Sequence, residues 1–182
     1  MRIARVLCGA LLLLGLSVEA SAVGLAVEQL EDTSVIYCPV CRRPIVPGSI
    51  HDNAVDIIAT EMGGALEERG LDYTEEPGEA RALNVLIYRF QERRGGNFSV
   101  ERPASVGFHV HLIEEGRVVG IFVFDETQQP LSENVFRFFT FLRRGLKWIT
   151  AEELAREGVD KAVDFFLKDL EPPPAPAREG RQ

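Results

Sequence analysis

The sequence predicts an α+β domain in which an antiparallel sheet of about four strands is packed by two helices on one face. Two observations carry this prediction. Apolar residues recur at helical spacing after residue 49 and again after residue 150. Between these regions, three segments are rich in the branched and aromatic residues that favour strands. A chain of 182 residues without internal repeats is long enough for one such domain with short appendages.

The first predicted helix starts near Ser49 and runs to about Arg69, where Gly70 is expected to end it. Its apolar residues lie three or four positions apart: Val55, Ile58, Met62 and Leu66. Gly63 and Gly64 lie inside this helix, where each glycine costs roughly 1 kcal/mol relative to alanine. We therefore expect this pair to permit close backbone packing.

The second predicted helix follows Thr150. Thr150 and Glu153 have the spacing of a capping box, in which each side chain accepts a backbone N–H at the helix start. One apolar stripe then continues to the end of the helix and is expected to cover the sheet: Ala155, Val159, Ala162, Val163, Phe166 and Leu170.

The predicted strands are Leu83–Gln91, Val106–Ile113 and Val118–Asp125, and Glu114–Arg117 reads as the turn of an antiparallel hairpin. A further short strand is expected to return from the turn at residues 93–97. The pattern of residues 23–31 assigns them to neither helix nor strand. Residues 135–142 are apolar on nearly every side and are expected to be buried.

The two ends of the chain predict its destination. Residues 1–22 have the basic start, short apolar run and small-residue cleavage site of a secretory signal peptide. The apolar run is shorter than the ~20 residues of a membrane-spanning helix, so we expect no transmembrane helix in the mature chain. Residues 171–182 are rich in proline and are expected to be disordered.

The chain thus divides into four parts: a signal peptide (1–22), an N-terminal segment with a CxxC loop (23–48), an α+β domain (49–170) and the tail (171–182). Because of the signal peptide, we expect the protein in the periplasm or cell envelope.

Charge excludes one class of partner. The net charge of −8 argues against nucleic acid, because binding to a phosphate backbone needs clustered lysine and arginine. Arg143, Arg144 and Lys147 lie beside Trp148 after an aromatic stretch, which leaves contact with a membrane surface as an alternative to a solvated loop.

Cys38 and Cys41 form the one CxxC motif, and a local disulfide is the interpretation that we favour for an exported chain. A thiol-redox site is a weaker alternative. In such sites the first cysteine usually caps a helix, and here Pro44 and Pro47 prevent a long helix from following the motif.

Zinc is the second alternative, since Cys-Pro-x-Cys between a short strand and a turn resembles one knuckle of a zinc ribbon. A closed zinc site needs four ligands. His109 and His111 are two positions apart in a predicted strand, so both imidazoles lie on one face of the sheet, with Phe108, Val110 and Leu112 on the core face. A site of Cys38, Cys41, His109 and His111 is therefore geometrically feasible, although alternating histidines usually mark a half-exposed face. His51 is expected to make only local hydrogen bonds.

No catalytic motif of the serine-hydrolase, metalloprotease or phosphate-loop type is present. The acidic pair Asp125-Glu126 follows a predicted strand and is interpreted as a strand-end turn. We therefore expect no enzyme and no cofactor, apart from the zinc alternative.

The order of elements resembles small bacterial envelope lipoproteins. The resemblance spans residues 50–170 and includes the strand Leu83–Phe90, the hairpin ending Phe122–Asp125 and the segment Pro130–Ser132 before the last helix. This group shares the fold of the curli-secretion lipoprotein, the penicillin-binding-protein activator lipoprotein and the amino-terminal domain of TolB. The sequence departs from it by lacking a lipid-bearing cysteine and by carrying the CxxC motif.

The resemblance implies a non-catalytic envelope protein that acts as an interaction or assembly module with a protein partner. The alternative function is that of a metal-binding or thiol-redox protein centred on Cys38 and Cys41.

Overall fold

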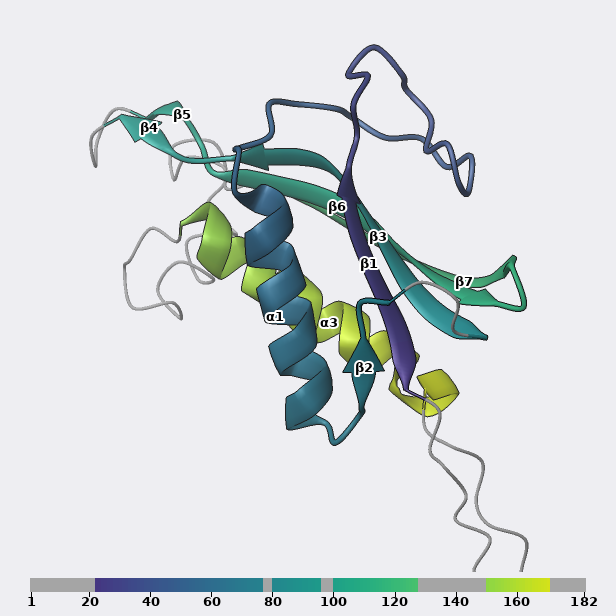
Figure 1. The fold of residues 1–182 in the computed structure, drawn as a ribbon. Helices are drawn as coiled ribbons and strands as arrows, with labels where there is room; N and C mark the ends of the chain where they lie inside the picture. Colours follow the sequence, from purple (N-terminus) through teal and green to yellow (C-terminus); the bar gives the residue numbers. More distant parts are fainter. Residues whose placement is uncertain (1–21, 77–79, 96–99, 128–149, 171–182) are drawn as a thin grey trace, which may run out of the picture.

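The computed structural model describes residues 22–76, 80–95, 100–127 and 150–170 (Figure 1). Its helices and strands are β1 (Val23–Gln29), α1 (Ala54–Glu68), β2 (Tyr73–Thr74), β3 (Arg81–Gln91), β4 (Arg94–Gly95), β5 (Val100–Arg102), β6 (Ser105–Glu114), β7 (Arg117–Thr127) and α3 (Ala151–Leu170). The predicted signal peptide, except for Ala22, lies outside the described residues. So do the apolar segment 135–142, the basic cluster 143–148 and the proline-rich tail.

The main sheet has five strands in the order β2-β1-β3-β6-β7. The pairs β3–β6 and β6–β7 are antiparallel, whereas β1 is parallel to both β2 and β3. The predicted α+β class is confirmed, but the prediction of an all-antiparallel sheet of about four strands was wrong. Parallel pairing of β1 requires a crossover connection, which α1 supplies, and hydrophobic periodicity carries no information about strand direction.

Both helices pack on one face of this sheet (Figure 1). The core between them contains the predicted core-facing residues of β6, namely Phe108, Val110 and Leu112. It also contains Ile58 and Met62 of α1 and Phe166 of α3, all fully buried. The apolar faces that the sequence predicts for the two helices are thus the faces that pack on the sheet.

The helix ends follow from local hydrogen bonds. Helix α1 begins at Ala54 rather than near Ser49, because the preceding residues pair with β3: Phe90 N–H donates to Ser49 O at 3.0 Å and His51 N–H donates to Phe90 O at 3.1 Å. Beyond α1, Gly70 has a φ of 72°, which only glycine adopts without strain.

The start of α3 has the expected capping box. Glu153 N–H donates to Thr150 Oγ1 at 3.1 Å, and Thr150 N–H donates to Glu153 Oε2 at 3.0 Å. The hairpin between β6 and β7 is also as predicted, with Glu115 and Gly116 at its tip, both in the left-handed region.

In the part of the chain that the structure describes, no helix combines the length and apolar character needed to cross a bilayer.

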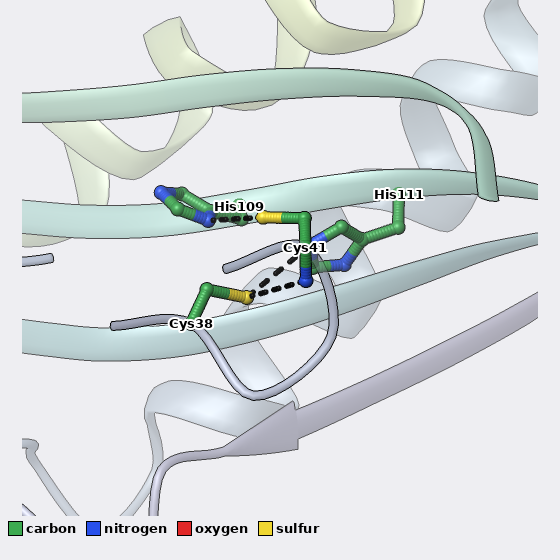
Figure 2. Close-up of side chains that lie close together, drawn as sticks. All are labelled: Cys38, Cys41, His109 and His111. Atoms are coloured by element: carbon green, nitrogen blue, oxygen red, sulfur yellow. Dashed lines mark hydrogen bonds between the residues drawn. The ribbon is translucent and has the colours of Figure 1, made fainter. Parts of the chain in front are cut away.

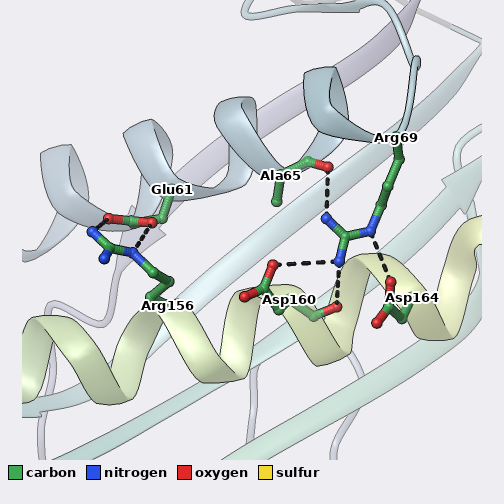
Figure 3. A network of polar contacts seen from close by, with 6 residues as sticks. All are labelled: Glu61, Ala65, Arg69, Arg156, Asp160 and Asp164. Atoms are coloured by element: carbon green, nitrogen blue, oxygen red, sulfur yellow. Dashed lines mark hydrogen bonds and ion pairs between the residues drawn. The ribbon is translucent and has the colours of Figure 1, made fainter. Parts of the chain in front are cut away.

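Two groups of ion pairs join α1 to α3 (Figure 3). Arg156 of α3 holds both carboxylate oxygens of Glu61, at 2.7 and 2.8 Å. Arg69, directly after α1, contacts Asp160 at 3.3 Å and Asp164 at 2.7 Å. Because a bidentate pair fixes orientation as well as distance, these contacts set the register of the two helices.

Replacing Glu61 tests the first of these pairs. Arg156 lowers the pKa of Glu61 from its ordinary value of 4.5, so the pair stabilises the fold above that pH and loses its effect as the pH falls through the lower folded-state pKa. At pH 7 we expect Glu61→Gln to lower the melting temperature by about 2 °C. Thermal melts between pH 7 and pH 3 should show the difference vanish in acid. Glu115→Gln, in an exposed pair with Arg117, is the control that should change nothing.

The two glycines of α1 should respond differently to alanine. A Cβ at Gly63 would lie 2.3 Å from the Tyr73 hydroxyl, whereas a Cβ at Gly64 meets no atom within 4 Å. Gly64→Ala should therefore raise the free energy of unfolding by about 0.5–1 kcal/mol through helix propensity alone. Gly63→Ala must displace Tyr73 and should gain nothing or lose stability. Urea unfolding of both variants measures the difference, and equal gains would contradict the packing role of Gly63.

Candidate metal centre

The connection between β1 and α1 covers the second face of the sheet, opposite the helices. Leu30, Cys38 and Ile45 of this connection are buried against Leu86 and Tyr88 of β3. Its backbone is joined to the same strand at both ends, since Leu30 N–H donates to Ile87 O at 2.8 Å and Gly48 N–H donates to Tyr88 O at 2.9 Å. The sheet is therefore buried on both sides near its centre.

A tight turn at the tip of this connection carries the two cysteines. Tyr37 and Pro44 form an isolated antiparallel bridge across its base. Within the turn, Cys38 N–H donates to Arg43 O at 2.8 Å and Arg42 N–H donates to Cys38 O at 2.9 Å. The amide of Cys41 lies 3.5 Å from the Cys38 sulfur, to which it donates. The turn thus points both thiols toward the sheet, and α1 does not begin until Ala54.

His109 and His111 of β6 lie on this covered face and are both 0% exposed. The expectation that they occupy a half-exposed face was wrong. Alternation along a strand shows which side chains share a face, but it does not show whether a distant segment covers that face. Here the connection of residues 30–50 covers it.

Each histidine faces one cysteine (Figure 2). The Cys38 sulfur lies 3.4 Å from His111 Nε2, and the Cys41 sulfur lies 3.4 Å from His109 Nδ1. All four donor atoms lie within 4.8 Å of one another. The structure therefore brings together the four residues that the sequence singled out, from segments 68 and 73 positions apart.

A hydrogen bond to the backbone of β3 orients the His111 ring. Its Nδ1 lies 3.2 Å from the Asn84 carbonyl oxygen, to which it donates, so Nε2 presents a lone pair toward Cys38. A backbone acceptor behind a ligating imidazole is typical of metal sites. His109 differs, because its Nε2 is buried without a hydrogen-bond partner among the described residues.

Burial sets the protonation of the cluster. It lowers the pKa of His109 to about 4, helped by nearby His111 and Arg43, and it lowers the pKa of His111 in the same direction. Both imidazoles are consequently neutral at pH 7. Burial also raises the pKa of the Cys38 thiol, although the amides of Cys41 and Val40 partly oppose this. A bound cation would reverse the shift at the sulfur, since it favours the thiolate.

The spacing suits a tetrahedral ion. Zinc–sulfur bonds of about 2.3 Å and zinc–nitrogen bonds of about 2.0–2.1 Å place sulfur and nitrogen ligands about 3.6 Å apart at tetrahedral angles. The two cysteine–histidine distances of 3.4 Å are close to this separation. Both cysteines are free thiols in the structure, and the local disulfide stays a prediction.

A second polar group next to the cluster was missed by the sequence analysis. Tyr88 donates to Asp125 Oδ2 at 3.0 Å, Arg89 forms an ion pair with the same carboxylate, and Arg89 Nη1 also donates to Val46 O at 2.9 Å. Asp125 therefore lies inside β7 rather than in the predicted strand-end turn, and the group as a whole joins β3, β7 and the connection. An arginine within the apolar run of β3 is the signal that could have revealed this group.

The remaining histidine lies apart from the cluster. His51 is exposed and its Nδ1 contacts Asn53 Oδ1, in agreement with the local hydrogen bonding expected for it.

Comparisons with known proteins give similarities of shape. No family model matches the sequence, and no curated protein matches it. Among solved structures, the PelC dodecamer from Paraburkholderia phytofirmans is 13% identical, with 79% of this chain and 86% of that chain covered and a TM-score of 0.47. Protein XCC0632 from Xanthomonas campestris is 16% identical, with coverages of 82% and 89% and a TM-score of 0.45. A minor lipoprotein from Acinetobacter baumannii is 13% identical, with coverages of 78% and 93% and a TM-score of 0.31.

One of these structures is thus a lipoprotein, and the resemblance read from the sequence stays a prediction. At these identities and TM-scores the similarity assigns no function. The chemistry of the chain has to be argued from its own residues.

The backbone of the cysteine turn can be tested at Arg42. This residue has a φ of 61°, a conformation that costs side chains other than glycine about 1–2 kcal/mol. Glycine relieves that strain but has more freedom to lose on folding, so we expect Arg42→Gly to raise the free energy of unfolding by about 0.5 kcal/mol. Arg43 is not in the left-handed region, so Arg43→Gly should lower the free energy of unfolding. Chemical denaturation of the two variants measures both changes. Similar losses of stability in both variants would show that Arg42 is unstrained.

Proposed function

We propose that this protein is an exported, non-catalytic envelope module whose fold is stabilised by a structural zinc ion bound to Cys38, Cys41, His109 and His111. The observation that carries the proposal is the convergence of two sulfur and two nitrogen donors, all within 4.8 Å, from two distant segments of the chain. Export is supported by the signal-like pattern of residues 1–22.

The donor set favours zinc over other common ions. Thiolate and imidazole are the ligands of structural zinc, whereas magnesium and calcium take oxygen ligands. Four protein ligands also complete a tetrahedron. Because a catalytic zinc needs a position for water or substrate, a fully occupied set supports a structural role.

The covering connection needs such a cross-link, since it has few buried apolar residues of its own. Three of its larger apolar side chains are more than half exposed, namely Ile36 at 62%, Tyr37 at 53% and Val46 at 65%. A metal that joins the cysteine turn to β6 would add binding free energy to the folding of this segment. It would also use the buried Cys38 thiol and the half-buried Cys41 thiol as ligands.

Thiol-redox catalysis is less well supported by the same geometry. A reactive cysteine has a lowered pKa, usually at the start of a helix. Burial raises the pKa of Cys38, the motif itself forms a turn, and the next helix does not begin until Ala54.

The test is a metal analysis of the full chain purified without chelators under reducing conditions. We expect about one zinc per chain. Cys38→Ser and His111→Gln should each lose most of it, while His51→Gln, which removes a histidine outside the cluster, should retain it. Chelation should lower the melting temperature of the parent chain and leave the two ligand variants unchanged.

Cobalt replacement provides a readout that does not depend on the stability of variants. A tetrahedral site with two sulfur ligands should give intense visible absorption and a sulfur-to-metal band, and zinc should remove both. Metal-free protein with a disulfide between Cys38 and Cys41 in the exported form would falsify the zinc proposal and support the disulfide interpretation.

A further inference from the structure

One edge of the main sheet has unpaired backbone in the described structure. Strand β2 pairs only with Val23 and Gly24 at the start of β1. The opposite side of β1 pairs with β3 as far as Gln29. Within the described ranges, the outer edge of residues 25–29 therefore has no neighbouring strand. Free N–H and C=O groups along such an edge are able to pair with another extended chain.

A groove runs between this edge and α1, which lies beside β1 in Figure 1. Its volume is about 750 Å³, and it is lined by residues of β1, α1 and the end of β2. Small residues leave it open: Ala59 and Gly64 of α1 line it, and a Cβ at Gly64 would meet no atom within 4 Å. The groove therefore lies where a strand added to β1 would pack against the uncovered side of the helix.

The charged residues that line the groove are all acidic. Asp56, Glu67 and Glu75 line it, all three are exposed, and no lysine or arginine does. None of these carboxylates forms an ion pair with another residue that the structure describes. An occupant with basic side chains would complement them, whereas an acidic one would be repelled.

A second copy of this chain fits less well. Its opposite sheet edge, β7, carries Asp125 and Glu126 and has Arg117 as its one basic residue. With a net charge of −8, two copies would bring like charges together at the groove.

We propose that the groove binds an extended, lysine- or arginine-bearing segment of a partner protein, which adds as a strand along residues 25–29 of β1. Alternate side chains of that strand face α1, where the carboxylates lie, and a five-residue pairing spans about 17 Å. The proposal rests on the role as a non-catalytic envelope module proposed above, and it adds an interaction surface and the chemistry of the partner. It does not involve the metal ligands.

The experiment uses three labelled peptides of seven residues. In one, lysine alternates with valine; in the second, glutamate replaces lysine; the third is the lysine peptide with N-methylated backbone at alternate positions. We expect the full chain to bind the first peptide, measured by fluorescence anisotropy at low salt, and to bind the other two at least about tenfold more weakly. Amide exchange should show new protection at residues 25–29.

Variants of the groove locate the binding. Gly64→Leu fills it at a position with free space and should weaken binding of the lysine peptide about tenfold, and the pair Asp56→Asn with Glu67→Gln should do the same. Glu115→Gln, at the remote hairpin tip, is the control that should bind normally. Zinc content, measured in parallel, should be the same in all of these variants, so a failure here is distinguishable from failure of the metal site.

Other outcomes would overturn the proposal. Equal binding of the N-methylated peptide would mean that charge alone attracts the ligand, without strand pairing. Equal binding of the glutamate peptide would contradict the complementarity of charge. Concentration-dependent dimerisation that protects the same amides would assign the edge to a second copy of the chain. If none of the peptides binds, the groove is not a binding site for an extended basic segment.

Discussion

The structure depends on the contact between residues 30–50 and the face of the sheet that the helices leave uncovered. Without that connection, His109 and His111 would be solvated side chains on an ordinary two-layer domain. With it, they are fully buried and face two thiols. The covering layer is small, with Leu30, Cys38 and Ile45 as its buried apolar residues, so its polar contacts matter more than they would in a larger core.

This dependence links the candidate metal centre to the rest of the molecule. The Nδ1 of His111 donates to the Asn84 carbonyl oxygen and the Cys38 sulfur accepts the Cys41 N–H, so the strand and the turn each hold one donor of the cluster in place. Next to the cluster, the group of Tyr88, Arg89 and Asp125 joins β3, β7 and the connection. The same strands thus support the helical core on one face and a polar layer on the other, and the interaction surface proposed on β1 lies at the edge of the helical layer.

Local patterns in the sequence predicted much of the fold and only part of the site. The capping box at Thr150, the hairpin tip at Gly116 and the stripe through Phe166 depend on neighbours a few residues away, and each was correct. The strand at Val23 and its parallel pairing depend on a partner more than fifty positions later, which periodicity does not record. For the same reason the sequence placed both histidines on one face but left that face half-exposed, and it did not connect Arg89 with Asp125.

The separation of the ligands along the chain has a consequence for biogenesis. His109 and His111 lie 68 and 73 positions beyond the cysteines that they face. If the chain is exported from its amino end and binds zinc as proposed, the thiols reach the oxidising compartment before the imidazoles. Dithiol oxidation and ion capture would then compete in time, and the speed of translocation would decide which cross-link the new molecule acquires.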